Sequence, residues 1–80
     1  MTEDQKDISL LLEVLEASRK VPRTAEWLAA ELRLAGRGGR DIHGLLRAMA
    51  QRDLVFVDED SLGIERWLIS EVGRRALDGL

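Results

Sequence analysis

The chain of 80 residues has no cysteine and a single proline. The lack of cysteine excludes disulfide bonds, a thiol nucleophile and a zinc–thiolate site. Such a chain suits a reducing compartment, so we expect a cytoplasmic protein. Its composition, 45% hydrophobic and 34% charged residues, is nevertheless that of a globular protein. Because this length supports only one small core, residues 1–80 should form a single domain.

Long apolar runs are also missing. The apolar run Leu10–Leu12 ends at Ser9 and Glu13, and no run approaches the ~20 apolar residues that span a membrane. The first residues are acidic, whereas a signal peptide begins with basic ones. These features predict a soluble protein that makes no membrane contact.

Groups for catalysis and for metal binding are scarce as well. His43 is the single histidine, and without a second histidine or a cysteine it is not expected to hold a metal. The run Asp58, Glu59 and Asp60 has neither the glycine nor the distant glutamate of a calcium loop. No nucleophile, base and orienting group occur together. We therefore expect no enzymatic activity and no cofactor.

The net charge of −3 hides an uneven distribution. Residues 19–52 contain eight basic and three acidic side chains, whereas residues 1–18 contain one basic and five acidic ones. Residues 53–71 contain one basic and six acidic side chains. The basic middle of the chain can face phosphates while both acidic flanks face elsewhere.

The first helix is predicted from about Glu3 to about Ser18, with Thr2 as its N-cap. One apolar stripe has the spacing of a buried face: Ile8, Leu11, Leu12 and Leu15. A second stripe consists of Leu10, Val14 and Ala17. A monomer of this size need not bury both stripes, so the second predicts a homodimer interface. Alternatively, the C-terminal helix of the same chain covers Leu10 and Val14.

The next two helices are separated by a glycine-rich turn. Thr24 caps TAEWLAAEL, and the cluster from Gly36 to Gly39 ends that helix. The third helix is predicted over 40–52. Its inner face carries Ile42, Leu45, Leu46 and Met49. Its outer face presents Arg40, His43, Gly44, Arg47 and Gln51.

A hairpin and a short helix complete the chain. The run LVFV from Leu54 predicts a strand, Asp58–Leu62 a polar turn, and IERWLI the second strand. Both tryptophans, Trp27 and Trp67, are expected in the core. Ser70 caps the last helix, in which Gly73 indicates close backbone contact. Three positions of this helix are expected to pack back on the domain: Val72, Ala76 or Leu77, and Leu80.

The order helix, helix, helix, strand, strand, helix resembles the winged helix-turn-helix fold, which is mainly α with a small β-hairpin. Three stretches carry the resemblance. They are TAEWLAAEL, then I-x-x-x-L-x-x-M-x-x-x-x-L-V from Ile42, then W-x-I-S-x-x-G-x-x-x-L from Trp67. The last two are similar to small bacterial regulators of the PadR and MarR type.

The resemblance implies a sequence-specific transcriptional regulator that places helix 40–52 in the major groove of double-stranded DNA. Arginine can bridge guanine O6 and N7, and glutamine can pair with adenine. Arg37 and the start of the helix can hold a backbone phosphate. The predicted DNA-contacting residues are Arg37, Arg40, His43, Gly44, Arg47 and Gln51.

Two departures from the family pattern bear on this function. Asp53 stands where the family often has a glycine, although aspartate tolerates left-handed geometry. The wing carries Asp58, Glu59 and Asp60, which phosphates would repel. The alternative function is a winged-helix adaptor that binds proteins and not DNA, with the acidic wing facing a basic partner.

Overall fold

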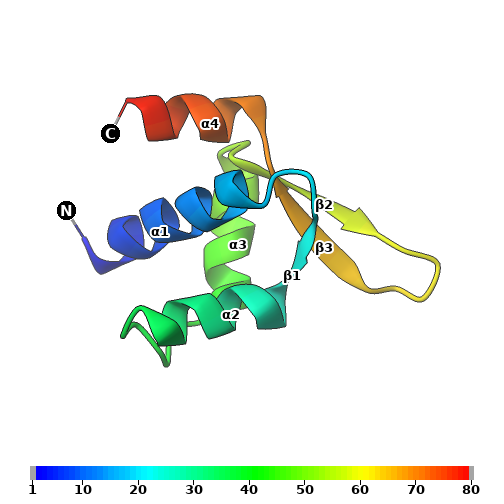
Figure 1. Ribbon diagram of the computed structural model, residues 1–80, viewed down its shortest axis with the longest axis horizontal. Helices are drawn as coiled ribbons and strands as arrows, with labels where there is room; N and C mark the ends of the chain where they lie inside the picture. Colours follow the sequence, from blue (N-terminus) through cyan, green and yellow to red (C-terminus); the bar gives the residue numbers. More distant parts are fainter. Residues whose placement is uncertain (1, 80) are drawn as a thin grey trace.

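The helices and strands follow the predicted order, with one strand added (Figure 1). The computed structural model describes residues 2–79. Its elements are α1 (Glu3–Ala17), β1 (Arg23–Thr24), α2 (Ala25–Leu34), α3 (Ile42–Gln51), β2 (Val55–Glu59), β3 (Glu65–Ile69) and α4 (Glu71–Asp78). The third helix is shorter than the predicted range 40–52, so Arg40 precedes it.

A polar side chain caps each helix at its start. Thr2 accepts a hydrogen bond from the Gln5 backbone N–H, and the Gln5 side chain bonds back, which forms a capping box. Thr24, Asp41 and Ser70 likewise accept from the backbone of the third residue beyond them. Each such cap contributes roughly 1 kcal/mol and helps to fix the residue at which its helix begins.

The core lies between α1, α2, α3 and the base of the sheet. The predicted stripe of α1 and the inner face of α3 are both buried, with Leu11 and Leu46 fully inaccessible. Trp67 is buried on β3 as predicted. Trp27 is only partly buried, however, because it packs at the edge of the core and the Arg23 guanidinium lies over its ring, 4.2 Å from the centroid.

The sheet has three antiparallel strands in the order β1-β3-β2. The sequence prediction missed β1, whose two residues pair with Trp67 and Arg66 of β3. The predicted turn Asp58–Leu62 was also wrong at its start. Asp58 and Glu59 belong to β2 and pair with Arg66 and Glu65. The wing is therefore longer than expected, and it projects away from the helices (Figure 1).

The start of α4 is held tightly against the end of α3. Asp53 adopts the left-handed backbone expected of it, with φ of 60°. The Ser70 hydroxyl donates to the Asp53 carbonyl while accepting from the Gly73 N–H. A Cβ at Gly73 would lie 2.2 Å from the Leu54 carbonyl oxygen. The close backbone contact predicted at Gly73 is thus confirmed.

Packing of α4 differs in part from the prediction. Ala76 and Leu77 pack against the core as expected. Val72 does not, since it is 44% exposed, and Leu80 lies outside the described residues. Within residues 2–79, no helix is long and apolar enough to cross a bilayer.

Candidate functional site

The exposed face of α3 carries three of the predicted contact residues. His43, Arg47 and Gln51 are all exposed and follow one another at four-residue spacing, which places them in one row along the helix. Gly44 lies beside them, half-buried. A Cβ at Gly44 would lie 2.5 Å from an Asp41 carboxylate oxygen, so glycine leaves room for the N-cap.

The charge of this face is positive along the helix itself. The segment Ile42–Gln51 contains no acidic residue. Within residues 2–79, neither Arg47 nor Arg52, the C-cap of α3, forms an ion pair within 4.0 Å, although both are exposed. These two guanidinium groups can therefore bind an anionic partner without first breaking an intramolecular ion pair.

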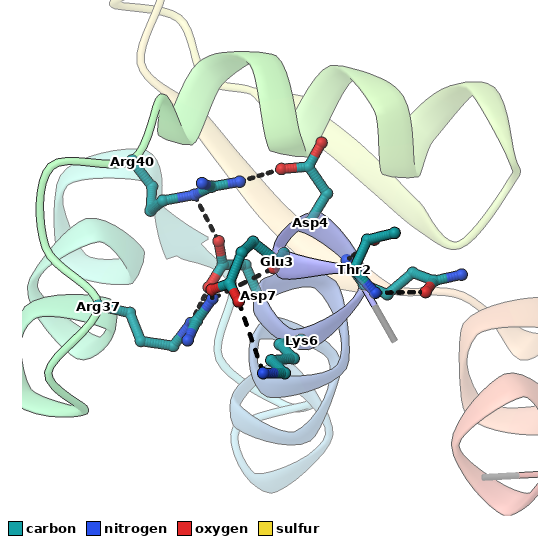
Figure 2. A network of polar contacts seen from close by, with 8 residues as sticks. Thr2, Glu3, Asp4, Lys6, Asp7, Arg37 and Arg40 are labelled. Carbon is teal, nitrogen blue, oxygen red and sulfur yellow. Dashed lines mark hydrogen bonds and ion pairs between the residues drawn. The ribbon is translucent and has the colours of Figure 1, made fainter.

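Arg37 and Arg40 are placed differently from the other predicted contacts. Both reach from the loop before α3 to the first turns of α1, where they pair with three carboxylates (Figure 2). We call this group the α1 ion cluster: Glu3, Asp4, Asp7, Arg37 and Arg40.

The centre of the α1 ion cluster is Asp7, whose side chain is fully buried. Arg40 Nε lies 2.6 Å from Asp7 Oδ2, and Arg37 Nε donates to Asp7 Oδ1. Arg37 also donates to Glu3, and Arg40 donates to Asp4. The two arginines thus hold α1 against the loop that leads into α3, and Asp7 lies between them (Figure 2).

These contacts alter the acidity of the groups at the surface of the cluster. The hydrogen bond from Arg37 lowers the pKa of Glu3, and the hydrogen bond to Asp7 raises the pKa of Arg37. Both groups are therefore held in their charged forms at neutral pH. Asp7 was not among the predicted site residues, although its spacing from Leu11 and Leu15 places it on the buried stripe.

The wing remains acidic in three dimensions. Asp60 accepts hydrogen bonds from the Leu62 and Ile64 backbone and from Arg66, and the bond from Arg66 is the main reason that the pKa of Asp60 is lowered. Asp58 and Glu59 are exposed on β2. Asp60 therefore shapes the turn, while the other two carboxylates face solvent.

The N-terminal end of α3 lies closer to two acidic side chains than its C-terminal end does. His43 lines a cleft of about 290 Å³ together with Glu26 of α2 and Glu65 of β3. Arg47 and Gln51 do not line this cleft. Electrostatic attraction of phosphates should therefore be strongest toward the C-terminal half of α3.

The predicted dimer residues are less exposed than the sequence suggested. Leu10 and Val14 are half-buried and pack against the core of the same chain, whereas Ala17 is exposed. The expected homodimer stays a prediction. Within the described part of the chain, no group of three or more histidine, cysteine or acidic residues is arranged to hold a metal ion.

Comparison with known proteins supports the fold. No family model and no curated protein sequence matches the chain. A crystal structure of the A103V mutant of MepR, from a multidrug-resistant S. aureus clinical isolate, is similar, with a TM-score of 0.78 and 20% sequence identity. The alignment covers 99% of this chain but 54% of the MepR chain, so the present chain spans about half its length. MepR is a winged-helix regulator of the MarR family. The chain therefore has a winged-helix fold, as the sequence predicted.

Proposed function

We propose that the chain is a DNA-binding transcription regulator that lays α3 in the major groove. The fold likeness to MepR, a DNA-binding transcription regulator, supports a regulatory role. The observation that carries the proposal is the exposed face of α3, which has no carboxylate and presents Arg47 without an intramolecular ion pair in residues 2–79.

The residues of this face suit contacts to base edges and phosphates. Arg47 can donate two hydrogen bonds to guanine, and Gln51 can exchange two with adenine. His43 can donate to a phosphate or a base acceptor. Gly44 makes no contact in this proposal, because the Asp41 carboxylate occupies the space beside its backbone.

Arg37 and Arg40 take a different part in this proposal. Their pairing with Asp7 fixes the loop that ends at the Asp41 cap, and so fixes the start of α3. We assign them to positioning the helix, and assign DNA contact to His43, Arg47 and Gln51.

The affinity for duplex DNA tests this assignment. Replacing Arg47 with alanine should weaken binding of a random-sequence duplex at low salt by about tenfold, because one phosphate or base contact is lost. The matched control is Arg75→Ala on α4, where the arginine is exposed and, among residues 2–79, pairs only with Glu71 one turn earlier. Fluorescence anisotropy of a labelled duplex measures both. Equal affinity of the two variants would contradict the proposal.

A protein-binding adaptor is the second candidate function. It is favoured by the exposed carboxylates of Asp58 and Glu59, which would repel phosphates if the wing approached the minor groove. The same titration separates the two functions, since an adaptor shows no salt-dependent affinity for DNA.

We further propose that the regulator is a homodimer that pairs through α1. The apolar side chains of Leu10 and Val14 are half-buried in one copy, and Ala17 is exposed beside them, so each retains surface for a second copy. The solution mass at micromolar concentration checks this expectation, and a monomer there would contradict it.

A further inference from the structure

One side of strand β2 has no neighbouring strand. In the order β1-β3-β2, β2 pairs with β3 and forms the edge of the sheet within residues 2–79. An edge strand offers a row of backbone N–H and C=O groups to a further strand. The wing projects away from the helices (Figure 1), and every β2 residue after Val55 is exposed.

The side chains of β2 are unusually apolar for an exposed edge. Phe56 is 60% exposed and Val57 is 46% exposed. They lie on opposite faces of the strand, because successive side chains alternate. Asp58 and Glu59 follow on the same two faces, so each face presents one apolar and one acidic side chain to any strand that pairs with β2.

Negative charge at this edge is not neutralised within the described residues. Asp58 is the pairing partner of Arg66, but Arg66 Nη1 lies 2.6 Å from Asp60 instead. Glu59 is directly opposite Glu65 across the hairpin, and like charges in that position are unfavourable. A cation placed beside Glu59 would relieve this repulsion.

We propose that the β2 edge binds an extended, cationic segment of another protein by adding it as a fourth strand. In antiparallel pairing, the sequence of the segment would be two basic residues followed by two apolar ones. The basic residues would face Glu59 and Asp58, and the apolar residues would face Val57 and Phe56. A second copy of this chain does not suit the edge, because it would bring the same carboxylates.

This surface is separate from α3 and goes beyond DNA binding, so it would connect the regulator to a protein partner. A labelled synthetic peptide containing Lys-Lys-Val-Ile tests it in the absence of DNA. We expect the peptide to shift the amide resonances of Val55–Glu59. The double variant Glu59→Gln with Glu65→Gln should bind the peptide roughly tenfold more weakly, because two negative charges are lost. The hairpin should stay folded, because the same change removes the repulsion between the two carboxylates.

Two controls make the test specific. Glu13→Gln removes an exposed carboxylate of α1 and should leave peptide affinity unchanged. A peptide with the order Lys-Val-Lys-Ile should bind more weakly, because its charges no longer meet adjacent carboxylates. Equal affinity for the double variant, or amide shifts confined to residues outside the hairpin of β2 and β3, would overturn the proposal. Shifts of the β2 amides on adding duplex DNA would assign the edge to nucleic acid instead.

Discussion

Replacing Arg37 and Arg40 together with alanine is expected to lower the free energy of unfolding by about 3 kcal/mol. The reason is Asp7, whose carboxylate is fully buried and is paired with both arginines. Without them, a buried charge has no compensating partner, which costs far more than the loss of a surface ion pair. Chemical denaturation followed by circular dichroism measures the change.

A third substitution separates this explanation from a general loss of packing. Adding Asp7→Asn to the double variant removes the buried charge and should recover more than half of the lost stability. Arg75→Ala alone, at a site 75% exposed, should change stability by less than about 0.5 kcal/mol. A triple variant no more stable than the double one would show that the charge of Asp7 is not the cause.

Replacing Gly73 with alanine should lower the free energy of unfolding by about 2 kcal/mol. This loss is expected even though alanine is roughly 1 kcal/mol more favourable than glycine inside a helix. The added Cβ would lie 2.2 Å from the Leu54 carbonyl oxygen and 2.9 Å from a carbon of Ile69. The first neighbour is backbone and cannot rotate away, so α4 must shift from the sheet. Thermal and chemical denaturation both measure the effect.

Gly79→Ala is the matched control for this variant. A Cβ at Gly79 would meet its nearest neighbour at 3.6 Å, an ordinary contact. We therefore expect a change of stability below about 0.5 kcal/mol. If Gly73→Ala were as stable as Gly79→Ala, the tight contact between α4 and Leu54 would be refuted.

The helices were predictable from the sequence because their signals are local. Thr2, Thr24 and Ser70 were predicted as caps before stretches of apolar periodicity, and each one does cap a helix. The left-handed backbone of Asp53 and the close contact at Gly73 were also predicted from single residues. Together with the strand pattern, these signals were sufficient for the winged-helix fold.

Features that depend on distant contacts were missed. Strand β1 has two residues and exists because Arg23 and Thr24 reach β3, far along the chain. A sequence pattern cannot show such a short pairing. The wing turn was placed too early, since Asp58 and Glu59 resemble turn residues although cross-strand pairing extends β2 through them.

The site was predictable only in part. Periodicity correctly placed His43, Arg47 and Gln51 on the exposed side of α3. Arg40 was grouped with them because the helix was predicted to begin at residue 40, and Arg37 because it precedes that predicted start. Their actual partners, Glu3, Asp4 and Asp7, are some 30 residues earlier in the sequence. Only the packing of α1 against the loop brings these charges together.

The most direct test of the central proposal is a map of the residues that duplex DNA perturbs. Amide resonances are recorded at low salt with increasing amounts of a random-sequence duplex. We predict shifts of His43, Arg47, Gln51 and their neighbours in α3 that reverse when salt is added, with the amides of Asp58–Asp60 unchanged. An absence of shifts, or shifts confined to the wing, would contradict DNA binding by α3.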